Sequence, residues 1–141
     1  MDRLARLPSR LVGQASLHAD RLVAAALAQE GMRRHHYAVL AALAEHGPAS
    51  QADLGRRLWI DRKDLHAVVA DLERGGLVSR VRDAADRRRN VVAATAAAPE
   101  TLERLDARVA AAQEAFLAPL DPAEREQLSA LLARLIDYYC G

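Results

Sequence analysis

The chain has 141 residues and a mass of 15.4 kDa, the usual size of one domain, and its 51% apolar composition excludes general disorder. Twenty basic and nineteen acidic side chains leave a net charge of +1, so any attraction to nucleic acid must come from local clustering. With one cysteine, Cys140, no bilayer-length apolar run and no signal-peptide pattern at its start, the sequence predicts a soluble, cytoplasmic protein without internal disulfides or a membrane partner.

Leucines and alanines at helical spacing predict two helices in the first third of the chain. The first extends from about Leu4 to Gly31, and Pro8 is expected to bend it or delay its start. The second extends over residues 33–45. It ends at Gly47-Pro48, because glycine favours a helix end and proline cannot continue the hydrogen-bond ladder.

Two short helices follow, each opened by a capping pair. Ser50 and Asp53 form the first pair, and Asp61 and Asp64 form the second. The second helix has one apolar stripe, which consists of Leu65, Val68, Val69 and Leu72 and ends before a glycine pair. Two short helices joined by a tight turn predict a helix-turn-helix.

The apolar period then changes to two, which is typical of strands. Residues 77–82 and 90–95 are extended runs, and the charged segment 83–89 between them predicts a long hairpin tip. Two long helices complete the chain. Pro99 suits the start of the first, and the sequence from Asp121 to Glu124 is a strong start for the second.

This order of elements predicts one domain over residues 1–141. The fold class is mainly α with a small β-hairpin wing: a winged helix-turn-helix over residues 33–96 between helical flanks at 1–31 and 97–141. The apolar stripes of these flanks are larger than one small winged domain can cover, so we expect them to form a homodimer. A purely intrachain helical hairpin is the alternative.

The positive charge is concentrated in the winged segment. Ten basic and six acidic side chains between Arg56 and Arg89 give +4, whereas the rest of the chain sums to −3. Phosphate binding needs such clustering, so the segment predicts contact with double-stranded DNA. The outward face of the second short helix presents the candidate contacts Arg62, Lys63, His66 and Arg74. A solvated amphipathic helix is the alternative interpretation.

Three consecutive arginines at the hairpin tip strengthen the DNA hypothesis. Like charges repel in a solvated loop, whereas a narrow minor groove attracts inserted arginine, so Arg87, Arg88 and Arg89 are candidate minor-groove contacts. Asp86 is placed to hold one guanidinium through a paired hydrogen bond.

Residues 77–88, Leu-Val-Ser-Arg-Val-Arg-Asp-Ala-Ala-Asp-Arg-Arg, resemble the wing of the MarR family, whose pattern is Leu-Val-x-Arg and then Asp-Pro-x-Asp-x-Arg. Residues 71–76 are similar to the end of that family's recognition helix. The resemblance implies that Asp86 orients the wing, that Arg88 enters the minor groove, and that the first, fifth and sixth helices intertwine in an obligate dimer. It also implies a transcriptional regulator, often a repressor, that responds to a small phenolic or other anionic ligand.

Such an effector would lie between the dimer helices and the winged domain. The candidate ligand-binding residues there are His18, Arg21, Arg34 and His36, with His36 first. The alternative for His36 is a histidine that makes an ordinary hydrogen bond in the core or at the surface.

Other kinds of site have little support in the sequence. The five histidines lack metal-ligand spacing, and nucleophile-elbow, phosphate-loop and metalloprotease motifs are missing, so no metal, cofactor or enzymatic activity is expected. Two alternatives stay open: a winged-helix protein-interaction module that binds no DNA, and a redox-responsive regulator that uses Cys140.

Overall fold

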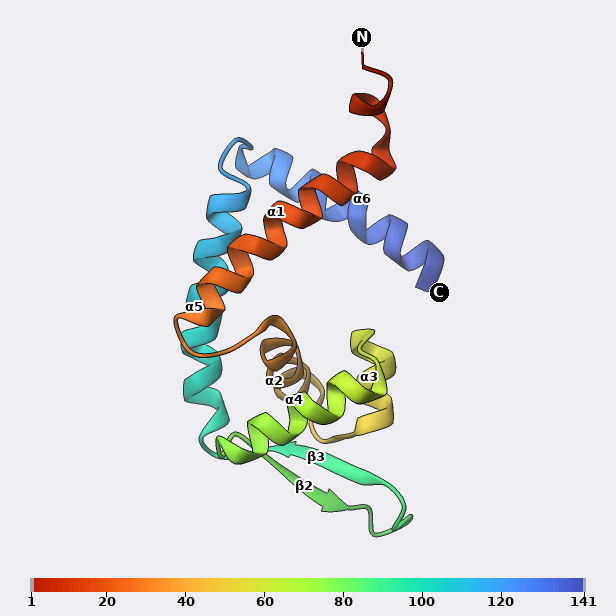
Figure 1. The fold of residues 1–141 in the computed structure, drawn as a ribbon, viewed down its shortest axis with the longest axis vertical. Helices are drawn as coiled ribbons and strands as arrows, with labels where there is room; N and C mark the ends of the chain where they lie inside the picture. The colour runs from red at the N-terminus through yellow and green to blue at the C-terminus, as the bar shows by residue number, and fades with distance from the viewer. Residues whose placement is uncertain (1, 141) are drawn as a thin grey trace.

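The computed structural model describes residues 2–140. Its elements, in chain order, are the 3-10 turn η1 (Leu4–Arg6), α1 (Pro8–Ala28), α2 (Arg34–His46), β1 (Ala49–Ser50), α3 (Gln51–Leu58), α4 (Arg62–Arg74), β2 (Val78–Arg82), β3 (Asn90–Ala94), α5 (Ala98–Phe116) and α6 (Pro122–Cys140). The predicted fold class, mainly helical with a β-hairpin wing, is confirmed. Figure 1 shows a winged lobe, residues 34–94, below a flank made by α1, α6 and the far end of α5.

The first helix starts late, one of the two effects expected of Pro8. The α-helix begins at Pro8, and residues 4–6 form a separate 3-10 turn. Proline has no backbone N–H and clashes with the preceding turn, whereas the first helical position tolerates it. Pro8 therefore fixes where α1 begins.

The sheet contains a strand that the sequence pattern did not indicate. β1 pairs antiparallel with β3, Ala49 opposite Val92 and Ser50 opposite Val91, which gives the strand order β1-β3-β2. β2 and β3 form the predicted hairpin, with Val78 opposite Ala94 and Arg82 opposite Asn90. A two-residue strand is too short to show a period of two. Its pairing nevertheless joins the start of α3 to the wing.

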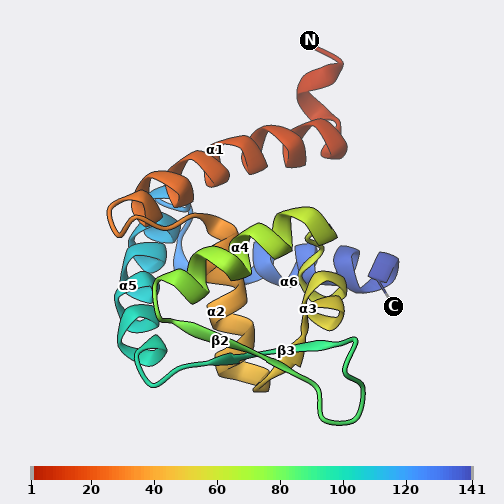
Figure 2. The same cartoon turned by 60° about the horizontal axis from the view of Figure 1, so that its bottom comes forward.

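The core of the winged lobe is built from the predicted apolar stripes. Leu65, Val68, Val69 and Leu72 of α4 are buried, and they pack in one cluster with Leu40 of α2 and with residues of α3 and the sheet. Figure 2 shows α4 lying across α2 with the sheet beside it. The core therefore fixes the outward face of α4 relative to the wing.

The predicted helix caps are present. The Asp53 backbone N–H donates to Ser50 Oγ at 3.1 Å, and the Asp64 N–H donates to Asp61 Oδ1 at 2.8 Å. Trp59 ends α3 in the left-handed region, with φ 58° and ψ 41°, and its side chain is 76% exposed. The turn between the two helices is thus made by a residue type that rarely adopts this conformation.

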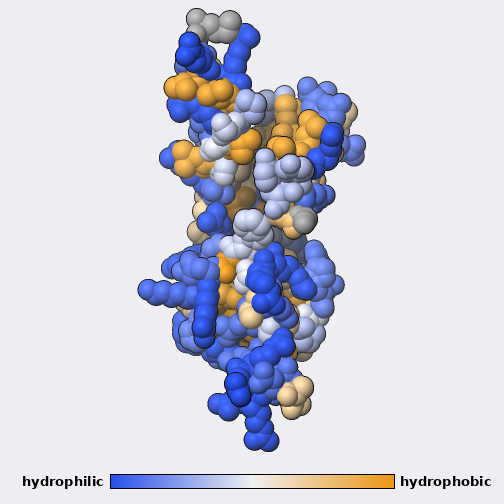
Figure 3. All heavy atoms as spheres, turned by 90° about the vertical axis from the view of Figure 1, so that its right-hand side faces the viewer, coloured by the Kyte–Doolittle hydropathy of each residue, from blue (hydrophilic) through white to orange (hydrophobic). Residues whose placement is uncertain are grey.

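The flanking helices leave apolar side chains in solvent. α1 packs along α5, but within residues 2–140 no side chain of α6 is buried. The large exposed apolar residues of the flank are Leu4, Leu7, Leu11, Val12, Leu17, Leu22, Leu131, Leu135, Ile136, Tyr138 and Tyr139. Figure 3 shows apolar patches on the flank, whereas the wing end is hydrophilic.

None of the described helices combines the length and apolar character that crossing a membrane requires.

Candidate nucleic-acid interface

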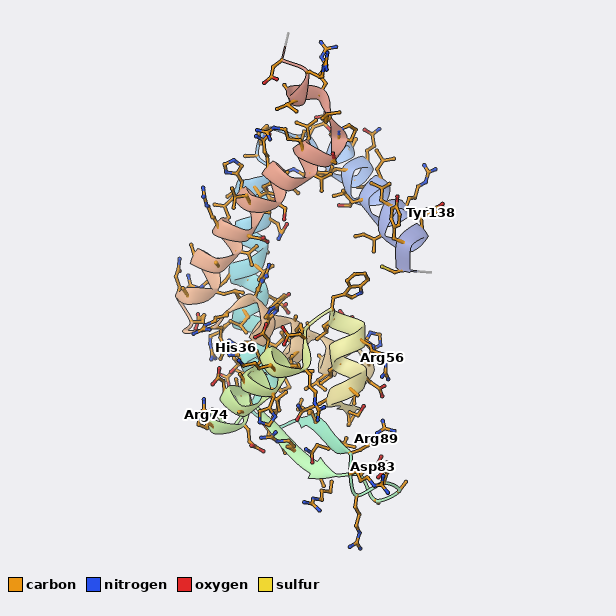
Figure 4. All side chains as sticks on the ribbon, turned by 45° about the vertical axis from the view of Figure 1, so that its right-hand side comes forward. His36, Arg56, Arg74, Asp83, Arg89 and Tyr138 are labelled. Carbon is orange, nitrogen blue, oxygen red and sulfur yellow. The ribbon has the colours of Figure 1, made fainter. Side chains whose placement is uncertain are left out.

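A groove of about 1020 Å³ lies between α3, the start of α4 and the wing. Its basic lining residues are Arg56, Arg62, Lys63, His66, Arg88 and Arg89. The small or apolar residues of its lining include Gly55, Ile60 and Leu65. In Figure 4, Arg56 and Arg89 lie on the same side of the winged lobe, Arg56 on α3 and Arg89 on the wing. Two consecutive helices and the wing thus present their cations to one concave surface, an arrangement that favours binding of a polyanion.

The recognition-helix candidates lie at the start of α4. Asp61 caps this helix, so Arg62 and Lys63 occupy its first turn, and both are exposed. The Asp64 backbone N–H donates to Asp61 and holds the pKa of that carboxyl below its usual value. His66 follows one turn later on the groove side. Their exposed positions at the N-terminal end suit contact with base edges or phosphates.

The wing loop is ordered by its own backbone. Asp83 N–H donates to the Arg89 carbonyl at 2.8 Å, and Arg89 N–H donates to the Asp86 carbonyl at 3.0 Å. Asp86 Oδ1 accepts the backbone N–H of Arg88 at 3.0 Å. From the sequence, Asp86 is expected to hold a guanidinium; in the structure its partner is instead a backbone N–H two residues ahead, a geometry that aspartate adopts readily. Asp86 therefore shapes the loop that carries Arg88.

The basic residues of the winged lobe divide into paired and unpaired groups. Within residues 2–140, Arg62, Lys63, Arg87 and Arg88 make no ion pair, whereas Arg74 pairs with Asp71 at the far end of α4. Arg80 donates to Glu73 at 3.1 Å and to Gln51 at 3.2 Å, so it joins the sheet to both short helices. Arg74, a sequence candidate, does not line the groove, and Arg56, which does, was not a candidate.

Comparison with known proteins identifies the family. A sequence profile of the MarR family matches residues 30–89. The crystal structure of a probable transcriptional regulator from Pseudomonas aeruginosa is 34% identical, with a TM-score of 0.85 over 95% of this chain and 100% of that one. The chain belongs to the MarR family. The relatives are transcriptional regulators and not enzymes.

Two further relatives bear on function. The PcaV transcriptional regulator from Streptomyces coelicolor, solved in complex with its natural ligand, is 31% identical, with a TM-score of 0.78 over 97% of this chain and 96% of that one. The HTH-type transcriptional repressor NicR from Pseudomonas putida is 30% identical over 72% of this chain. The match spans 64% of the length of the curated relatives.

The exposed effector candidates of this MarR-family chain belong to two parts of the structure, α1 of the flank and the start of α2 in the winged lobe. His18 and Arg21 are exposed on α1, and Arg34, at the first position of α2, lies 3.6 Å from Asp20. These three side chains bring cationic or titratable groups to the region where α1 meets α2. None of them contributes to the groove beside the wing.

His36, the first-choice effector residue, is buried and has internal partners. Its Nδ1 accepts the backbone N–H of Arg33 at 2.9 Å, and its Nε2 lies 3.0 Å from Asp71 Oδ2. The Nδ1 contact assigns the ring proton to Nε2, which donates to Asp71. This hydrogen bond is the main cause that lowers the pKa of Asp71. His36 thus caps α2 and links it to α4. This matches the alternative interpretation, a buried histidine that makes ordinary hydrogen bonds within the protein.

Proposed function

We propose that this MarR-family chain is a homodimeric, sequence-specific repressor that binds double-stranded DNA and responds to a small anionic or phenolic effector. The observation that carries the proposal is the groove beside the wing. Its lining includes Arg62, Lys63 and Arg88 from the recognition helix and the wing, which form no ion pair within residues 2–140. We assign Arg62, Lys63 and His66 to the major groove and Arg87 and Arg88 to the adjacent minor groove.

Homodimer formation is supported by the exposed flank. Leu131, Leu135 and Ile136 of α6 are each more than half exposed, next to two exposed tyrosines. Burial of one such leucine contributes about 1.5–3 kcal/mol, so a few of them stabilise an association substantially. A two-fold pair of winged lobes would place its recognition helices on half-sites about one helical turn apart, which implies a pseudopalindromic operator.

The effector proposal rests on charge and on the relatives. Arg21, Arg34 and His18 provide donors for a carboxylate or phenolate beside the apolar flank. PcaV is solved with its natural ligand, and NicR is named a repressor, so we extend ligand response and repression to this chain. His36 would then act as a structural link, because both of its ring nitrogens already have partners.

The test is DNA binding by the purified full chain at two salt concentrations. Genomic fragments recovered by footprinting, its own promoter included, are titrated by fluorescence anisotropy at about 50 and 200 mM salt. A dimer with about six phosphate contacts should lose about a thousandfold in affinity across that range. Arg104→Ala, which removes a cation on α5 that pairs with Glu30, is the control and should bind as the wild type does.

The outcomes separate the alternatives. Absence of binding to every fragment would leave the winged-helix protein-interaction module as the better description. Cys140 is exposed at the end of α6, so operator binding is also measured with and without oxidant. If oxidant removes operator binding by the wild type but not by Cys140→Ser, the redox-responsive regulator is favoured instead.

A further inference from the structure

Asp53 on α3 faces two guanidinium groups that line the groove. Arg56 Nη2, one turn along α3, donates to Asp53 Oδ1, and Arg89 Nη2 of the wing lies 3.4 Å from Asp53 Oδ2. The two arginines belong to elements far apart in sequence, and Figure 4 shows them on the same side of the lobe. One carboxylate of the helix-turn-helix therefore contacts two arginines that line the groove, one on its own helix and one on the wing.

The two acids of the wing loop, unlike Asp53 of α3, accept hydrogen bonds from the loop's own backbone. Asp83 Oδ1 accepts the Ala85 N–H at 2.9 Å, and Asp86 Oδ1 accepts the Arg88 N–H at 3.0 Å. Arg89 stands where the loop closes, with its carbonyl bonded to the Asp83 N–H. Its side chain, unlike that of Arg88, reaches back to α3. A contact at this position links the base of the loop to the helix that packs beneath the recognition helix.

We propose that Asp53 is a positioning and specificity-determining residue for DNA binding, a role that rests on the proposed function. Through Arg89 it holds the wing against α3. Through both arginines it also withholds positive charge from DNA phosphates, because a guanidinium paired with a carboxylate contributes less to counterion release than a free one. Arg89 then holds the wing against α3, whereas Arg88 contacts DNA.

This arrangement affects specificity as well as affinity. Phosphate contacts carry no sequence information, whereas base contacts by Arg62, Lys63 and Arg88 do. The withheld charge lowers specific and non-specific binding alike, because both use phosphate contacts. The wing that Asp53 holds through Arg89 keeps Arg88 in place for base contact, which only the specific complex uses. The ratio of specific to non-specific affinity therefore rises, which is the quantity that matters against a genome of competing sites.

The test compares Asp53→Asn with the wild type on a labelled duplex of random sequence. Asparagine keeps the backbone N–H that donates to the capping Ser50 Oγ and keeps the size of the side chain, while it removes the negative charge and one of the two acceptor oxygens. The slope of log affinity against log salt should steepen by about one per protomer, and affinity for this duplex should rise about tenfold at low salt. On an operator fragment recovered by footprinting, affinity should rise less, so the specificity ratio falls.

Arg89→Gln completes a double-mutant cycle. In the wild-type background its effect on the salt slope should be small, whereas in the Asp53→Asn background it should remove most of the added slope. Glu73→Gln is the matched control. It also removes a carboxylate that pairs with an arginine, but that arginine, Arg80, is mostly buried and does not line the groove. Its slope should equal that of the wild type.

The positioning role has its own measurement. Amide hydrogen exchange of residues 83–89 in the free protein should be faster in Asp53→Asn than in the wild type, and unchanged in Glu73→Gln. Unchanged exchange would overturn the positioning role, and an unchanged salt slope would overturn the withholding of charge. Failure of the wild type to bind any duplex would instead refute the proposed function, while the exchange measurement would still test the contact.

Discussion

His36→Leu separates a structural histidine from an effector-binding one. Leucine has a similar size, so the substitution removes the hydrogen bonds without a large cavity. The Arg33 N–H loses its acceptor, which costs about 1 kcal/mol in the free energy of unfolding, as for other lost N-terminal caps. Loss of the Asp71 contact adds to this. We expect the melting temperature to fall by about 4 °C, measured by circular dichroism at one protein concentration.

The pH dependence of stability gives the same substitution a second readout. The His36 hydrogen bond lowers the pKa of Asp71 from its ordinary value of 3.8. A lowered carboxyl pKa in the folded state stabilises it above the unfolded value, and the contribution disappears as pH falls through the folded pKa. In urea titrations at several acidic pH values, the free energy of unfolding of His36→Leu should therefore fall less with decreasing pH than that of the wild type. His35→Leu, a neighbouring half-buried histidine, is the control and should leave both readouts unchanged. Wild-type stability in His36→Leu with loss of the effector response would refute the structural role.

Three further predictions concern DNA, assembly and alkaline pH. Arg88→Ala should cost about 1–3 kcal/mol of operator binding in anisotropy titrations while the dimer stays intact; an unchanged titration would remove Arg88 from the interface. Leu131→Lys with Leu135→Lys should convert the dimer to a monomer in sedimentation velocity, because two charges would lie on the exposed apolar face of α6; a persistent dimer would place the interface elsewhere. Burial and the hydrogen bond to Asp106 raise the pKa of Tyr37 from 10.0 to about 12, so its stabilisation is present below pH 10 and is lost as pH rises through about 12. In urea titrations, the free energy of unfolding of Tyr37→Phe should therefore fall less with rising alkaline pH than that of the wild type. The same pH dependence in both proteins would contradict the assignment.

Local patterns predicted the local parts of the fold. Ser50 and Asp61 accept hydrogen bonds three residues ahead, and the apolar stripe of α4 repeats within one helix, so a short window of sequence contains each signal. The charge of segment 56–89 likewise predicted which lobe carries the cations, and the groove gathers many of them.

The parts that sequence reasoning missed depend on contacts between distant residues. Arg89 meets Asp53 across 36 positions, and His36 meets Asp71 across 35. A single sequence contains no periodicity that pairs such residues. Asp86 shows the opposite error: its charge suggested an arginine partner, whereas a backbone N–H two residues away is closer and needs less ordering of side chains.

Trp59, the only tryptophan in the chain, gives the molecule a built-in optical reporter. Its indole stands in solvent at the turn between α3 and α4, so red-shifted emission is its resting signal. Any occupant that covers this turn will shift the emission to the blue, without a dye. The indole belongs to the winged lobe, whereas the two exposed tyrosines belong to the last turn of α6, the end of that helix that lies toward α3 in Figure 1.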